Sequence, residues 1–92
     1  MPFVQTSVVT SDGSITTAPA IVYGVVSAAG GTGGLWQLND STDDSGTDLI
    51  SGFAQASSQT YIDLSQSPVQ FSTAIRADLA GSNQILTVFY TS

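Results

Sequence analysis

Turn-forming residues interrupt this chain at short intervals, and this spacing constrains its fold more than any other feature. Clusters rich in Gly, Ser, Asp or Pro fall at residues 11–14, 30–34, 40–48, 65–68 and 80–83. The segments between them are short and rich in Val, Ile, Thr and aromatic residues, which favour strands of about five to eight residues. Apolar residues do not recur with the period of an amphipathic helix. The sequence therefore predicts an all-β protein.

Apolar runs, alternating or continuous, define the predicted strands. They cover residues 3–10, 15–17, 20–29, 35–39, 61–64, 69–71, 73–79 and 84–90. The Asp12-Gly13 pair between the first two strands is a strong signal for a β-hairpin turn. About eight short strands at this spacing predict a single small β-sandwich or jelly-roll-like domain.

Two segments leave alternatives open. Residues 20–29 are hydrophobic or small on both faces, which indicates a central strand covered on both sides or a strand covered by a neighbouring subunit. Residues 51–59 follow the short apolar pair Leu49-Ile50 and could form a short helix. Gly52 and the paired serines that follow it argue against a long helix.

The 92 residues are enough for one small domain and not for two. We expect residues 18–92 to form the sandwich and residues 1–17 to form an N-terminal arm or hairpin, for which pairing with a neighbouring chain is an alternative to pairing with its own sheet. The sequence contains no Cys, so no disulfide stabilises this small chain. Assembly with other subunits could supply that stability, because binding to the folded form stabilises it.

The inventory of reactive side chains argues against an enzyme. The chain has no His, no Cys and no Lys, and its charged side chains are seven Asp and Arg76. Acid–base and nucleophilic catalysis near neutral pH mostly use the residues that are missing. A glycosidase pair of Asp residues needs an apolar pocket to raise one pKa, and Ser- and Gly-rich loops offer little of that shelter. We therefore predict a protein without enzymatic activity or cofactor that acts by fitting against other proteins.

The charge of the chain excludes several partners. The formal net charge is −6 and the pI is near 4.1, so phosphate and anionic lipid headgroups are repelled. We expect no binding to nucleic acid or membranes. The most apolar stretch, residues 18–29, is too short to span a bilayer, and residues 1–5 lack the basic residues of a signal peptide. The expectation is a soluble protein made without export.

Residues 39–48 hold four of the seven carboxylates, and three of these, Asp40, Asp44 and Asp48, recur every four residues. Oxygen-rich loops of this kind can bind calcium. The position of Gly46 and the missing closing Glu do not match the EF-hand pattern. A solvated turn, in which Asp and Ser side chains bond to nearby backbone N–H groups, is therefore the favoured interpretation, with a cation site as the alternative.

Five residues are candidates for a protein interface: Phe3, Val4, Tyr23, Trp36 and Arg76. Trp36 is favoured as a core or interface residue, since Trp is mostly buried, with sugar stacking by Trp36 and nearby tyrosines as the alternative. Arg76 and Asp78 lie on the strand face opposite Ile75. We expect Arg76 to pair with a carboxylate of its own chain, with an intersubunit contact as the alternative.

From residue 20 onward the sequence resembles small β-sandwich structural proteins of tailed bacteriophages. The resemblance covers about three quarters of the chain and consists of strand and turn patterns. These are Ile21-Val22-Tyr23-Gly24-Val25-Val26, Leu35-Trp36-Gln37-Leu38-Asn39-Asp40-Ser41, Ser45-Gly46-Thr47, Ser67-Pro68-Val69-Gln70-Phe71 and Leu86-Thr87-Val88-Phe89-Tyr90.

This resemblance implies a non-enzymatic virion component, and in particular a capsid decoration (cement) subunit on the capsid surface, assembled in the host cytoplasm. The implied partners are the major capsid protein or other virion proteins, together with further copies of the chain in a homo-oligomer such as a trimer. The alternative function is a tail or surface module that binds glycans through Trp36 and nearby tyrosines.

Overall fold

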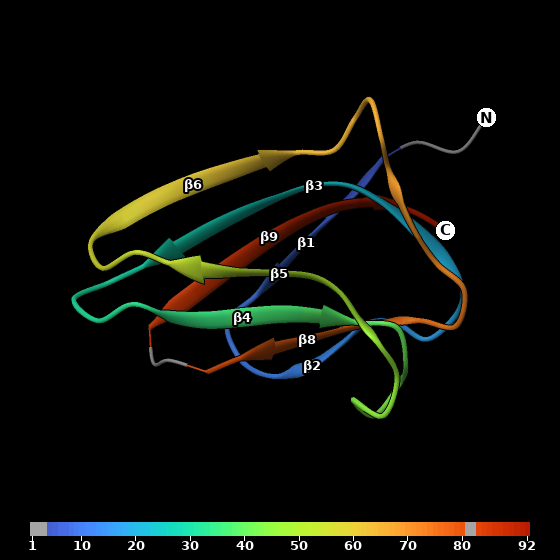
Figure 1. Cartoon of the computed structure of the whole chain (residues 1–92), viewed down its shortest axis with the longest axis horizontal. Coiled ribbons are helices and arrows are strands. Elements are labelled where there is room, and N and C mark those ends of the chain that lie inside the picture. The colour runs from blue at the N-terminus through green and yellow to red at the C-terminus, as the bar shows by residue number, and fades with distance from the viewer. Residues whose placement is uncertain (1–3, 81–82) are drawn as a thin grey trace.

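The computed structural model describes residues 4–80 and 83–92, and within them it consists of strands, turns and loops (Figure 1). The described residues contain no helix long and apolar enough to cross a membrane. The strands are β1 (Gln5–Val9), β2 (Gly13–Thr16), β3 (Ala20–Ala29), β4 (Gly34–Asn39), β5 (Asp48–Ala54), β6 (Ser58–Asp63), β7 (Val69–Phe71), β8 (Ile75–Leu79) and β9 (Gln84–Thr91).

Two antiparallel sheets pack against each other as a β-sandwich, which confirms the predicted fold class. Sheet A has the strand order β1-β9-β3-β6, and β7 pairs with the first part of β3. Sheet B has the order β2-β8-β4-β5. Figure 1 shows β6, β3 and β9 on one side of the molecule and β4, β8 and β2 on the other. Edge strands are therefore β1, β6 and β7 in sheet A, and β2 and β5 in sheet B.

Alternation along the strands builds the core between the sheets. Ile75 and Ala77 of β8 are fully buried, whereas Arg76 and Asp78 point to the opposite face, as the sequence predicts. The same alternation holds in the other central strands. Among the buried apolar side chains are Val22, Val25, Phe71, Leu86 and Val88 from sheet A and Trp36, Leu38, Ile75 and Ala77 from sheet B. Burial of a Val, Leu, Ile or Phe side chain contributes about 1.5–3 kcal/mol.

Strand β3 is the centre of sheet A, because it pairs with β9 on one side and with both β7 and β6 on the other. Its bounds match the predicted strand. Tyr23 occupies a bulge between Val22 and Gly24, where the partner of β3 changes from β7 to β6. The Tyr23 carbonyl accepts a hydrogen bond from the Leu64 N–H at 2.9 Å, so the extra residue is held by the chain that follows β6.

Residues 4–17 do not form the predicted intersubunit arm. Strand β1 pairs along β9 in sheet A, and β2 pairs along β8 in sheet B, so both belong to the sandwich of their own chain. The predicted hairpin at Asp12-Gly13 is not formed. The favoured hairpin turn needs positive φ, which Gly13 does not have. The Asp12 carboxylate instead accepts a hydrogen bond from the Leu79 N–H at 2.7 Å and fixes the crossing between the sheets.

Residues 51–59 form no helix. They contain the second half of β5, a turn and the start of β6. Both are edge strands, and β6 is mostly exposed. The first part of β6, residues 58–60, is polar and gives no apolar alternation, whereas residues 61–63 lie within the strand predicted at 61–64. Ser57 adopts a positive φ of 54° in the turn between the two strands.

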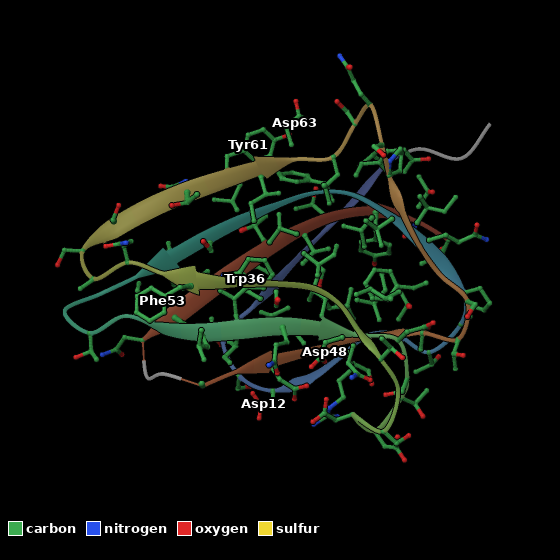
Figure 2. All side chains as sticks on the ribbon, in the orientation of Figure 1. Asp12, Trp36, Asp48, Phe53, Tyr61 and Asp63 are labelled. Atoms are coloured by element: carbon green, nitrogen blue, oxygen red, sulfur yellow. The ribbon has the colours of Figure 1, made fainter. Side chains whose placement is uncertain are left out.

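Gly52 allows Trp36 to pack between the sheets. The Trp36 side chain is 1% exposed and lies in the core, next to β5 in Figure 2. Gly52 is its register partner on β5. A Cβ atom on Gly52 would lie 2.7 Å from Cζ2 and 2.9 Å from Cε2 of the indole ring. Such distances are too short for carbon atoms, so any side chain at this position forces the ring or the strand to move.

We expect Gly52→Ala to lower the free energy of unfolding by about 1–3 kcal/mol, because the new methyl group overpacks the core against Trp36. Gly13→Ala is the matched control, since a Cβ there meets nothing within 4 Å, and it should change stability by less than about 0.5 kcal/mol. Urea unfolding followed by Trp fluorescence measures both. Equal stabilities of the two variants would contradict this packing.

Candidate interaction surfaces

The outer face of sheet A carries a group of apolar side chains that the chain itself leaves uncovered. In β1, β3 and β9 the residues next to these in sequence face the core, and Ile62, next to Tyr61, packs against it. Because side chains alternate along a strand, the apolar side chains between them point outward. The register brings strands β1, β9, β3 and β6 side by side. We call this group the apolar face, and it consists of Val8, Val26, Ala28, Tyr61, Ile85 and Phe89.

The apolar face is contiguous across all four strands. One row of the register runs Val8–Thr87–Val26–Tyr61, from one edge of the sheet to the other. Val8 is 63% exposed and Tyr61 is 58% exposed, while Val26 between them is half-buried. Single exposed apolar residues are ordinary, but an exposed group that spans a sheet marks an interaction surface.

Tyr61 is held in a defined position on this face. Its ring meets the Phe89 ring edge to face, with centroids 6.3 Å apart and an interplanar angle of 89°. This arrangement is favourable for aromatic pairs. Gly24 on β3 makes room for it: a Cβ there would lie 3.1 Å from Cε1 and 3.2 Å from Oη of Tyr61. The glycine therefore lets the ring lie close to the sheet.

The charged side chains lie mainly away from the apolar face. Asp63, at the end of β6, is the one carboxylate on this sheet. The remaining charged side chains lie in sheet B, in the loop between its strands β4 and β5, or at the crossing between the sheets; they are Asp12, Asp40, Asp43, Asp44, Asp48, Arg76 and Asp78. Figure 2 shows Tyr61 and Asp63 at the top of the molecule and Asp12 and Asp48 at the bottom.

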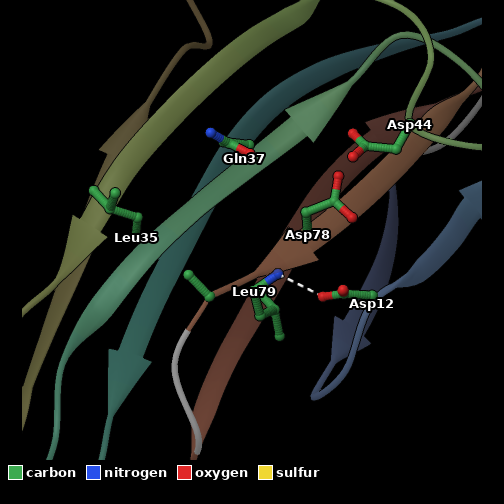
Figure 3. Close-up of a pocket in the computed structure, with 7 residues that line it drawn as sticks. Asp12, Leu35, Gln37, Asp44, Asp78 and Leu79 are labelled. Atoms are coloured by element: carbon green, nitrogen blue, oxygen red, sulfur yellow. Dashed lines mark hydrogen bonds between the residues drawn. The ribbon is translucent and has the colours of Figure 1, made fainter.

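The outer face of sheet B holds a small acidic pocket with an apolar wall (Figure 3). Three carboxylates from distant segments meet there: Asp12, Asp44 and Asp78. Gln37 and the apolar residues at 35, 79 and 80 complete the lining of a cavity of about 240 Å³. Asp44 reaches the pocket from the β4–β5 loop with a positive φ of 68°, a conformation that Asp tolerates better than most residues.

Asp78 is the most perturbed group of the pocket. Its burial raises its pKa, and the hydrogen bond and negative charge of Asp44 raise it further. Arg76 lowers the pKa, with Nε 3.5 Å from Oδ1 of Asp78. The result is a pKa of about 6. This ion pair matches the predicted pairing of Arg76 with a carboxylate of its own chain.

We expect stability to fall as the pH rises from about 4 to about 6. The pKa of Asp78 is raised from 3.8 to about 6 on folding, so the folded state holds this proton more tightly than the unfolded state. Asp78→Asn removes this ionisation. The variant should be more stable than the natural protein at pH 7.5, by about 1–2 kcal/mol, and its stability should change little between pH 4 and pH 6.

The control for this experiment is Asp63→Asn, which makes the same change of charge. Hydrogen bonds from Ser65 lower the pKa of Asp63, so its contribution is lost only at more acidic pH. This control should keep the slope of the natural protein between pH 4 and pH 6. Urea unfolding at a series of pH values gives the profiles. Parallel profiles for Asp78→Asn and the natural protein would contradict the assignment.

Carboxylates of the 40–48 loop are bound individually by the chain. The Asp40 carboxylate accepts hydrogen bonds from the N–H groups of Ser72, Thr73 and Ala74, at 2.8–3.3 Å. Asp43 accepts bonds from Ser45 in its own turn. The Asp43 bonds match the favoured interpretation of a turn, whereas Asp40 bonds to residues 72–74, which are distant in the sequence. Within residues 4–80 and 83–92 no group of three potential ligands is arranged to hold a metal ion.

Asp40 connects the β4–β5 loop to the segment between β7 and β8. Partial burial raises the pKa of Asp40, but the bonds from Thr73, Ser72 and Ala74 outweigh this effect and lower the pKa below its ordinary value. The carboxylate therefore remains ionised and keeps the two segments together until the pH falls below the ordinary range of Asp.

We predict that Asp40→Ala lowers the free energy of unfolding by about 1–3 kcal/mol, because three backbone N–H groups lose their acceptor. Asp43→Ala removes the same charge from the same loop but breaks only a local turn at a fully exposed position, and it should lower stability much less than Asp40→Ala. Thermal unfolding at pH 7 measures both variants. A loss at position 40 no larger than that at position 43 would show that Asp40 does not hold these segments.

The residues predicted for an interface do not share one surface. Phe3 lies outside the described residues. Val4 is exposed just before β1, and Tyr23 is half-buried at the bulge of β3. Trp36 is buried in the core, which confirms the core half of the favoured interpretation. Its ring cannot contact a partner or stack on a sugar, so its place among the interface candidates and the sugar-stacking alternative are wrong. Arg76 lies on the outer face of sheet B beside the acidic pocket.

The sequence interpretation missed most of the apolar face. The one signal for it in the sequence was that residues 20–29 are apolar on both faces. This pattern indicated that one face of the strand, which holds Val26 and Ala28, could be covered by a neighbouring subunit. Tyr61, Ile85 and Phe89 come from other strands, and only the register of sheet A places them beside Val26. A single sequence does not reveal that register.

Comparison of this chain with protein families, with curated proteins and with solved structures finds no match. The resemblance to phage sandwich proteins has no support from these comparisons and stays a prediction. Inferences about function therefore depend on the surfaces of the molecule.

Proposed function

We propose that the protein is a non-enzymatic structural subunit that acts by burying the apolar face of sheet A against protein. The observation that carries this proposal is the uncovered row from Val8 to Tyr61 across a paired sheet. Removal of apolar area from water contributes about 25 cal/mol per Å², so such a face gains free energy when a matching surface covers it.

The chemistry of the chain supports this role. The sequence lacks His, Cys and Lys, and its carboxylates mostly bond to the backbone or to nearby side chains. A rigid sandwich with an exposed apolar sheet is suited to adhesion, because the sheet presents its side chains in a fixed arrangement before it binds. Little conformational entropy is then lost on binding.

We further propose that the setting is a virion, with the protein as a capsid decoration subunit whose partners are the major capsid protein or other virion proteins. Support for this setting comes from the strand and turn patterns that resemble phage sandwich proteins, such as the strand from Ile21 to Val26. The glycan-binding alternative is less well supported, because the indole ring of Trp36 on which it depended is enclosed in the core.

Reconstitution tests this proposal. Phage particles assembled from a genome that lacks this reading frame are mixed with the purified protein, and bound protein is quantified after sedimentation. We expect saturable binding at a fixed ratio to the capsid protein and an increase in the temperature at which the particles open. Serum albumin serves as the control for non-specific adsorption. A protein that neither sediments with the particles nor changes their thermal opening would refute the proposed setting.

A further inference from the structure

We propose that the apolar face binds the apolar face of a second copy of this chain, so that two sandwiches pack sheet A against sheet A about a two-fold axis. This inference rests on the proposed structural role and names the partner of that surface. Face-to-face packing of sheets at a distance of about 10 Å is the ordinary arrangement inside a β-sandwich.

The distribution of charge favours a second copy over a charged partner. The chain carries a net charge of −6, so two copies repel each other wherever their carboxylates meet. On sheet A only Asp63 is charged among the described side chains, and it lies at the end of the edge strand β6. Two copies joined through this face keep their acidic sides apart. A charged partner would lose hydration here without gaining ionic contacts.

The strand order of sheet A also suits a two-fold arrangement. An axis that runs along the strands between β9 and β3 places β1 opposite the partner's β6, and β9 opposite the partner's β3. In the row from Val8 to Tyr61, the smaller Val8 at one edge then faces the larger Tyr61 of the partner. A self-complementary surface of this kind is what a closed dimer requires.

The neighbouring row fits the same axis. It runs Thr6–Phe89–Gly24–Asp63 across the four strands. The axis places Phe89 opposite the partner's Gly24, over which the partner's Tyr61 ring lies, so the aromatic rings of the two copies come together. It also places Asp63 opposite the hydroxyl group of the partner's Thr6 and not opposite a second carboxylate. The assembly is closed after two copies, which distinguishes it from the trimer expected from the sequence.

Sedimentation equilibrium of the purified protein measures the stoichiometry directly. We expect a reversible dimer with twice the 9.4 kDa of one chain. Val8→Lys, which places an ammonium group in the apolar face, should weaken dimerisation at least about tenfold. Ser51→Lys is the matched control, since it makes the same change of charge at an exposed, outward-facing position of the edge strand of sheet B. Its dimerisation should change by less than about twofold. Circular dichroism melts confirm that both variants fold.

Thiol cross-linking tests the geometry, and the absence of natural Cys gives a clean background. A mixture of Val8→Cys and Tyr61→Cys proteins should form the mixed dimer with a short bis-maleimide, because the backbones of sheets about 10 Å apart are too distant for a direct disulfide. Ser51→Cys mixed with Tyr61→Cys is the control and should not cross-link above the level of random collision. Preferential cross-linking of this control pair would overturn the proposed face.

Three results would overturn the inference. One is a monomer at all concentrations up to about 1 mM, which corresponds to less than about 4 kcal/mol of binding free energy. Another is a trimer, and the third is a dimer equally sensitive to Val8→Lys and Ser51→Lys. If the monomeric protein still binds particles and Val8→Lys abolishes that binding, the apolar face contacts another protein. In that case the dimer is refuted while the proposed structural function stands.

Discussion

Strand β3 is the constraint on which the rest of this structure depends. It is the longest strand, lies in the centre of sheet A, and carries apolar or small residues on both of its faces. One face supplies Val22 and Val25 to the core. The opposite face carries Val26 and Ala28 and would need a second layer to cover it. The nine described strands of this chain form no such layer over it. The sandwich therefore satisfies one side of its central strand and leaves the other for a partner.

The two outer faces of the sandwich differ in chemistry, and this difference organises the molecule. Sheet B and the loops beside it carry most of the carboxylates, some of which, such as Asp40 and Asp12, hold loops and sheets together. In the pocket around Asp78, burial of its carboxylate and the nearby Asp44 raise its pKa to about 6. Sheet A presents a face almost free of charge. A chain this acidic can associate with itself only where its charge is low.

Much of the fold could be predicted from local sequence, because each strand follows turn chemistry and side-chain alternation. The bounds of β3 and β7 and the two faces of β8 were predicted from these signals alone. Predictions failed where a distant contact decides the structure. Asp12-Gly13 resembles a hairpin turn, but Asp12 bonds to the backbone of Leu79 and the chain crosses to the other sheet. β5 and β6 are edge strands, whose exposed residues give little pattern.

The candidate surfaces were harder to predict than the fold. The apolar face combines residues from β1, β3, β6 and β9, and the acidic pocket combines residues 12, 44 and 78. Both depend on strand register between segments far apart in the sequence, which one sequence does not encode in a readable way. The position of Trp36 was hard to predict for the same reason. Its ring fits in the core because the neighbouring strand has Gly52 beside it, and the sequence does not show which residue lies there.

Footprinting with a photoactivated carbene tests most directly whether the apolar face is covered in the associated protein. Tyr61 on sheet A and Phe53 on sheet B make an internal comparison, because their exposed fractions in the single chain are 58% and 53%. When the protein is concentrated, labelling of Tyr61 should fall while labelling of Phe53 stays constant. Equal labelling of the two rings at every concentration would contradict the account.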